Sequence, residues 1–199
     1  MKNLLNVGSI IFFIGFFIKF FHIHYNAVVM LAGLFMLLVA SLVAIVKKEG
    51  GVNGWAHLAA TFWLALLLFT IKFYPFVTVV LTLAVASTII SLIAIAKAKT
   101  WKASVFPAIC MVLAITFYLT PADNKYRLMN VRWNYEIDTD FATWDKYSWF
   151  LYQSGKYEEA LDASNTALRI ASEAGDTEWG NFIADHRSRI EQRSWTTFR

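Results

Sequence analysis

A lysine and a histidine end the first apolar stretch of the chain, in the spacing Gly15-x-x-x-Lys19-x-x-His22. Amines and imidazoles at a membrane helix can take up and release protons, so they mark candidate ion paths. His24 follows in the same break, and His57 lies near the start of the third apolar stretch. Ion coupling calls for a buried charge partner, and none of the apolar stretches contains Asp or Glu.

These residues also have a simple structural interpretation. A lysine near a helix end can extend its apolar stem and bring its ammonium to the headgroups. Lys72 occupies the matching position in a second copy of the segment, so Lys19, Lys72 and the neighbouring His22 are expected to act as polar membrane anchors. The histidines are expected on opposite membrane faces. They therefore predict no shared metal or haem site.

The apolar stretches contain one short segment twice. Residues 18–20, IKF, return at 71–73, and residues 41–47, SLVAIVK, return at 91–97 as SLIAIAK. The IKF segments of the two copies are about 53 residues apart, and the SLVAIVK and SLIAIAK segments are about 50 residues apart. Each copy is a hairpin of two helices, and an even number of helices leaves both copies facing the same way. A parallel internal repeat is therefore expected.

Composition indicates a membrane protein. The 199 residues are 58% hydrophobic and 16% charged, whereas a soluble domain carries about 25% charge. Five stretches approach the roughly 20 apolar residues that cross a bilayer; they run roughly from Leu4 to Phe21, Ala27 to Val46, Trp55 to Phe73, Phe76 to Ala96 and Ala103 to Leu119. We expect a transmembrane domain over 1–120, with hairpins at about 4–48 and 55–99 and a fifth span at about 103–119. The small residues expected to allow close helix packing are Gly8, Gly15, Gly33, Ala40, Ala84 and Ser87.

The lysines predict the orientation. If the spans alternate, Lys19 and Lys72 lie near one side, and the larger set on the other side is Lys2, Lys47, Lys48, Lys97, Lys99 and Lys102. The lysine-rich side is normally cytoplasmic, which places the N-terminus in the cytoplasm of a bacterial inner membrane and the C-terminal domain in the periplasm. A fifth stretch that only dips into the bilayer, where Pro107 interrupts it, would return the C-terminal domain to the cytoplasm. Because the basic charge flanks membrane helices and the tail is mildly acidic, no nucleic-acid partner is expected.

The composition changes after Pro121. Residues 121–140 are mixed and aromatic, which suits an extended or interfacial connector. From Phe141 onward, apolar residues recur at helical spacing, and Gly155 and Gly175 separate three expected helices within 141–199.

One motif in this tail resembles a single tetratricopeptide repeat. It reads Trp144-x-x-Tyr147-Ser148-x-x-Leu151-x-x-x-Gly155-x-Tyr157-x-x-Ala160-Leu161, followed by Ala167-Leu168. The resemblance implies a pair of helices that binds a peptide or protein and does not catalyse. Trp144, Tyr147 and Tyr157 would hold the pair together, and Trp149 and Tyr152 would contact the partner. Ser164 and Ser172 depart from the family pattern, and a generic helical hairpin with a glycine turn remains the alternative.

The first hairpin also resembles, over about 40 residues, the membrane hairpin of the gliding-motility and type IX secretion motor subunit. The resemblance rests on Gly15-x-x-x-Lys19-x-x-His22. In that family the lysine pairs with a glutamate on the second helix during proton-driven rotation. The second stretch here, 27–46, contains no acid, so the partner that proton conduction requires is missing.

Together these patterns predict an all-α polytopic membrane bundle of about five helices, two repeated hairpins plus one, with a small helical C-terminal domain. Neither a phosphate-binding loop nor a catalytic spacing occurs, so no enzyme, cofactor or metal is expected. The expected function is a scaffold or accessory subunit of an envelope complex for secretion, translocation or motility, with the lipid bilayer and other membrane or envelope proteins as partners. The alternative is a small transporter or channel built from the duplicated hairpins.

Overall fold

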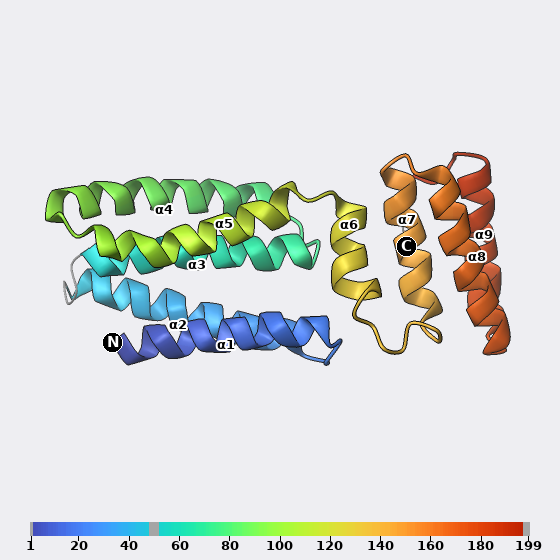
Figure 1. Ribbon diagram of the computed structural model, residues 1–199, viewed down its shortest axis with the longest axis horizontal. Helices are drawn as coiled ribbons and strands as arrows, with labels where there is room; N and C mark the ends of the chain where they lie inside the picture. The colour runs from blue at the N-terminus through green and yellow to red at the C-terminus, as the bar shows by residue number, and fades with distance from the viewer. Residues whose placement is uncertain (1, 48–51, 197–199) are drawn as a thin grey trace. The chain divides into compact units, whose positions relative to one another are not determined.

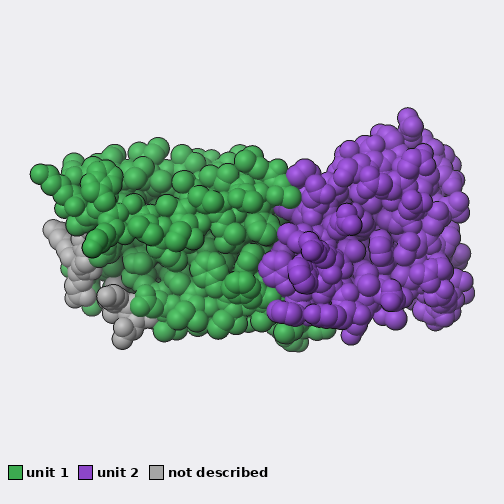
Figure 2. Space-filling view, viewed as in Figure 1, with its two compact units in different colours: residues 1–19, 23–120 green, residues 20–22, 121–199 purple. Residues whose placement is uncertain are grey.

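The structure is a computed structural model that describes residues 2–47 and 52–196. Lys48, Glu49, Gly50 and Gly51 lie outside the described residues, as does Arg199. The described chain is helical and contains no strand. It divides into two compact units, Met1–Lys19 with Ile23–Thr120 and Phe20–His22 with Pro121–Arg199, which Figure 2 colours separately.

Unit 1 is a bundle of apolar helices that lie side by side (Figure 1). They are α1 Lys2–Phe20, α2 Asn26–Val46, α3 Val52–Ile71, α4 Val77–Ala98, a short 3-10 turn Trp101–Ser104 and α5 Val105–Leu119. The stretches long and apolar enough to cross a membrane are Asn26–Val46, Asn53–Ile71, Val77–Ala98 and Trp101–Leu119. The apolar part of α1, Leu4–Phe20, is shorter. The fifth expected span therefore reaches membrane length when its 3-10 turn is included, whereas the first, over its described residues from Leu4 onward, is shorter.

Helix α3 occupies the centre of unit 1. It packs against α2, α4 and α5, and 72% of its apolar window is buried, compared with 28% in α4 and 17% in α5. Leu64, Leu66 and Leu67 on α3 are completely buried. The exposed apolar side chains of α4 and α5, such as Ile89 and Val112, form the kind of outer surface that suits lipid.

Glycines bring α1 and α2 into close contact. A Cβ on Gly33 would lie 2.5 Å from the Phe12 nitrogen and 2.8 Å from the Gly8 oxygen, and one on Gly15 would lie 2.8 Å from the Met30 nitrogen. Only glycine permits this approach, as the sequence predicted. The remaining predicted packing residues are buried too: Ala40, Ala84 and Ser87.

The two hairpin turns share one backbone pattern. Left-handed residues occur at His22 (φ 53°) and Tyr25 (φ 65°) in the first turn, and at Phe73 (φ 54°) and Phe76 (φ 67°) in the second. Both pairs are offset by the same 51 residues. In this register Lys72 lies just beyond the end of α3, whereas Lys19 lies in the last turn of α1, so the two lysines do not occupy equivalent helical positions.

Unit 2 contains α6 Ala122–Tyr126, a π-helical turn Arg127–Val131, α7 Phe141–Gln153, α8 Tyr157–Glu173 and α9 Thr177–Glu191. Helices α7 and α9 begin at aspartate caps, because Asp140 and Asp176 accept hydrogen bonds from the backbone nitrogens three residues ahead. Helices α7 and α8 are followed by Gly155 (φ 76°) and Gly175 (φ 71°), whose left-handed conformation favours glycine. These local signals explain why the predicted helix boundaries match the observed ones.

The first half of the expected connector is helical and contributes to the core of unit 2. Tyr126 stacks on Tyr147 of α7 with ring centroids 6.3 Å apart, and it contacts the tilted ring of Phe150 at 4.8 Å. Met129 is completely buried. Tyr126 and Met129 are three residues apart, so one helical turn places both on the same face, whereas the sequence pattern suggested an extended segment.

Candidate functional site

The five aromatic residues singled out in the sequence all lie on α7 or α8, and they are packed to different extents. Tyr147 is buried, while Trp144, Trp149, Tyr152 and Tyr157 are half-buried. The Trp144 indole nitrogen donates to the Ile137 carbonyl oxygen over 3.1 Å. Trp144 and Tyr147 thus make contacts within unit 2. Trp149 and Tyr152 are half-buried, and their expected contact with a partner stays a prediction.

Tyr152 secures the segment that follows α9. Its hydroxyl oxygen accepts a hydrogen bond from the Trp195 backbone nitrogen over 3.2 Å, and the two rings lie 6.1 Å apart. The Arg193 guanidinium lies over the Tyr157 ring at 4.6 Å, a favourable cation–π distance. Tyr152 and Tyr157 therefore both contact the segment after α9. The sequence, which predicted only that Tyr157 holds the helix pair together, did not indicate this contact because it joins residues about forty positions apart.

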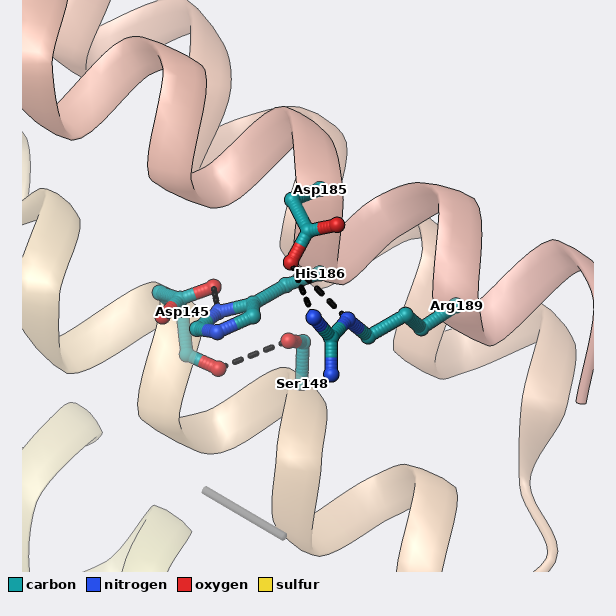
Figure 3. A network of polar contacts seen from close by, with 5 residues as sticks. All are labelled: Asp145, Ser148, Asp185, His186 and Arg189. Atoms are coloured by element: carbon teal, nitrogen blue, oxygen red, sulfur yellow. Dashed lines mark hydrogen bonds and ion pairs between the residues drawn. The ribbon is translucent and has the colours of Figure 1, made fainter. Parts of the chain in front are cut away.

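A buried acid–base pair connects α7 to α9. The Nδ1 atom of His186 lies 2.9 and 3.0 Å from the two carboxylate oxygens of Asp145, and both side chains are almost fully buried. The imidazole lies between two aromatic rings, Phe182 at 4.2 Å and Trp195 at 4.5 Å. Figure 3 shows this pair beside the exposed Asp185–Arg189 ion pair of α9.

This arrangement favours a structural role over a catalytic one. A carboxylate that orients a histidine is one part of a nucleophilic triad, but the nearby Ser148 hydroxyl donates to the Asp145 backbone oxygen over 2.7 Å (Figure 3). The aromatic rings on the imidazole restrict access to it. Asp145 and His186 therefore connect two helices inside a core.

Sequence reasoning missed this pair. His186 continues the apolar stripe formed by Trp179, Phe182, Ile183 and Ile190 on α9, and Asp145 lies in the apolar pattern of α7. The sequence did contain a signal for this pair, because each of two neighbouring helices has a titratable residue at an apolar position.

Comparison with known proteins adds no assignment. No family model, curated protein or solved structure matches the chain. The possible role of unit 2 has to follow from its own residues.

A groove lies on α9 at the surface of unit 2. Its volume is about 580 Å³, and among the described residues it is lined by Glu178, Trp179, Asn181 and Phe182. The two aromatic rings pack edge to face 5.5 Å apart, and Trp179 also contacts Phe141 of α7. Aromatic side chains that are held in place and flanked by an acid and an amide are typical of a protein-binding surface.

A second charged cluster joins α6 to the turn between α7 and α8. The Lys156 ammonium lies 2.7 Å from the Asp123 carboxylate, and the Ser154 hydroxyl donates to the same group over 3.1 Å. Burial raises the pKa of Asp123, but the hydrogen bonds and the charge of Lys156 outweigh that effect and hold the pKa below its usual value. The cluster fixes the start of unit 2 against its first helical hairpin.

The polar membrane residues differ in burial. Lys19 is 5% exposed, whereas Lys72 and His22 are half-buried. His22 lies before α2 and His57 near the start of α3, so the whole 21-residue helix α2 separates them along the chain. Within the described residues no group of three or more His, Cys, Asp or Glu side chains could hold a metal ion.

Proposed function

We propose that the chain is a non-enzymatic scaffold or accessory subunit of a bacterial envelope complex. Unit 1 would anchor it in the inner membrane with the N-terminus in the cytoplasm, and unit 2 would dock a partner protein in the periplasm. Secretion, translocation or motility machinery is the proposed setting. The observation that carries this proposal is the aromatic groove of about 580 Å³ on α9, in a unit whose buried Asp123, Asp145 and His186 are used for internal contacts.

The local structure supports the resemblance of 141–199 to a single tetratricopeptide repeat. Helices α7 and α8 lie where the motif requires two helices, with Gly155 in the left-handed turn between them. The motif alanines Ala160 and Ala167 are completely buried, which is the role that small residues have where two helices approach. A lone repeat offers little surface of its own, so α9 would supply the groove. A generic helical hairpin accounts for the same features.

The groove suggests the chemistry of its partner. Trp179 and Phe182 provide apolar surface, and Glu178 places a carboxylate in the first turn of α9. A partner segment with an apolar side chain next to a lysine or arginine would match both features.

Affinity purification of the full-length protein from its native membrane tests this docking. Glu178→Arg should reverse the groove charge and strongly reduce recovery of the partner. Glu158→Arg is the matched control, because Glu158 is also an exposed glutamate in the first turn of a helix, α8, outside the groove. Equal recovery with both variants would refute docking at α9, and the native protein eluting without any partner would refute the scaffold.

The side of the membrane that unit 2 occupies can be tested separately. The single cysteine, Cys110, is buried, so a Glu158→Cys variant introduces one exposed thiol. Labelling of intact inner-membrane vesicles and spheroplasts with an impermeant maleimide should modify this thiol from the periplasmic face. Labelling from the cytoplasmic face alone would overturn the proposed orientation.

The transporter alternative has less support. A transport path would need polar groups that face a shared cavity, but the hydroxyls of Thr61 and Thr88 donate to carbonyl oxygens of their own helices. The matched backbone of the two hairpin turns, with left-handed residues offset by 51 positions, supports an internal duplication. This duplication is better explained as a way of building the membrane anchor than as a way of building a transport path, because α3 fills the centre of unit 1.

A further inference from the structure

A small apolar groove lies in unit 1 between α4 and α5, with α3 on its inner side. Its volume is about 150 Å³. The lining includes Ala59 and Trp63 from α3, Ser91 from α4, and Pro107 and Ala108 from α5. Helices α4 and α5 both pack against α3, and their outward faces are largely exposed, so the groove opens toward the region that lipid would occupy.

The groove contains polar groups placed at fixed positions. The Trp63 indole nitrogen donates to the Thr88 hydroxyl oxygen over 2.8 Å, and that hydroxyl donates to the Ala84 carbonyl oxygen over 2.7 Å. Ser91 is only 2% exposed and lines the groove. Its hydroxyl is a donor that an occupant with an acceptor oxygen would match.

Positive charge is concentrated at the end of the groove that is closest to the connection between α4 and α5. Its lining comes from the C-terminal half of α4 and the N-terminal half of α5, and the connection between these helices carries Lys97, Lys99 and Lys102. Lys97 follows Ser91 by six residues, which is about 9 Å along a helix. A phospholipid whose ester lies near Ser91 would therefore have its phosphate and headgroup on the side of these lysines.

We propose that this groove binds one acyl chain of an anionic phospholipid. The chain lies against Trp63 and Ala108, the Ser91 hydroxyl donates to an ester carbonyl oxygen, and the lysines of the connection contact the phosphate and the anionic headgroup. A transmembrane helix is too large to enter, because a single turn occupies roughly 400 Å³ or more given its diameter and pitch. The volume of the groove instead suits a few methylene groups in single file.

Filling the groove tests the acyl-chain site. Ala108→Phe should place a ring in the groove, and Ile109→Phe is the matched control, since Ile109 is the next residue and is exposed on the outer face of α5. The full-length protein is reconstituted in phosphatidylcholine vesicles that contain phosphatidylglycerol with brominated acyl chains. Bromine should quench Trp63 in the native protein, identified as the fluorescence lost in Trp63→Phe, and Ala108→Phe should weaken apparent binding about tenfold.

The headgroup contact is tested with the same vesicles. Replacing Lys97, Lys99 and Lys102 with glutamine should abolish the preference for brominated phosphatidylglycerol over brominated phosphatidylcholine. Lys47→Gln, at the end of α2, should preserve that preference. Ser91→Ala, which removes one oxygen atom and adds no bulk, should weaken quenching without removing the headgroup preference.

Two results would overturn the proposal. One is equal quenching in Ala108→Phe and Ile109→Phe when both variants retain the native helix content. The other is crosslinking of a photoreactive residue at Ala108 to a second copy or another protein in native membranes, in place of lipid. The result is independent of partner docking by unit 2, because the vesicles contain no partner.

Discussion

The imidazole of His186 and the carboxylate of Asp145 lie 2.9 Å apart inside unit 2, although 41 residues separate them in the chain. The pair joins α9 to α7, the rings of Phe182 and Trp195 pack against the imidazole, and both side chains are buried. Removing one partner leaves the other as a buried polar group without its hydrogen bond.

We expect Asp145→Ala to destabilise unit 2 by about 3 kcal/mol. Asp185→Ala is the matched control, because Asp185 forms an exposed pair with Arg189 on the same helix, and such pairs contribute about 0–1 kcal/mol. Denaturant unfolding of the full-length protein in detergent, followed by tryptophan fluorescence, measures both. Similar losses would show that the buried pair has no special role.

The Asp123 cluster predicts a loss of stability in acid. Because hydrogen bonds and the charge of Lys156 hold the Asp123 pKa below its usual 3.8, ionised Asp123 contributes stability above that pH. The contribution should fade as the pH falls from about 4 through the lower folded-state pKa. Unfolding midpoints measured against pH should show this loss in the native protein.

Asp123→Asn should remove this loss of stability at acid pH. Glu158→Gln should leave the loss unchanged, because Glu158 is exposed on α8. The same cluster acts with opposite sign in alkali. The Asp123 carboxylate raises the pKa of Lys156 above 10.5, so its contribution is present below that pH and is lost only above it. If the Asp123→Asn variant lost stability in acid as the native protein does, the loss could not be assigned to Asp123.

The α1–α2 crossing predicts a strong effect of a single methyl group. We expect Gly33→Ala to destabilise the bundle by roughly 1–3 kcal/mol, because the added Cβ meets backbone atoms of α1 at 2.5–2.9 Å. Ala32→Leu, at a neighbouring exposed position, should be nearly neutral. Thermal unfolding in detergent micelles compares the two variants, and equal melting temperatures would argue against this crossing.

Two glycines of unit 2 should respond to alanine with opposite signs. Gly155 has φ 76° with open space around it, so Gly155→Ala should cost about 1 kcal/mol through backbone strain alone. Gly180 lies within α9, also in open space, so Gly180→Ala should stabilise the helix by about 0.5–1 kcal/mol. Denaturation midpoints of the two variants should move in opposite directions, and a shift in the same direction would contradict the turn geometry at Gly155.

The sequence predicted the features that depend on local signals. Apolar length placed the membrane helices, and the glycines at 155 and 175 placed the ends of α7 and α8. The pairing of Asp145 with His186 and the packing of Tyr126 on Tyr147 depend on contacts between distant segments, for which periodicity carries no information. For the same reason the sequence did not reveal that Tyr152 secures the segment around Trp195.

The central position of α3 has a consequence for how the protein is made. Its apolar window has the lowest mean hydropathy of the four membrane-length stretches, while its neighbours along the chain, α2 and α4, are the most apolar. Once the bundle is assembled, a helix that is surrounded by protein on most sides does not need to be as apolar as one that faces lipid. During synthesis, however, α3 leaves the translocon before all of the helices that surround it are in place. We therefore expect α3 to partition poorly when it emerges alone and to enter the bilayer together with α2 and α4, which makes biosynthesis of the bundle a cooperative event.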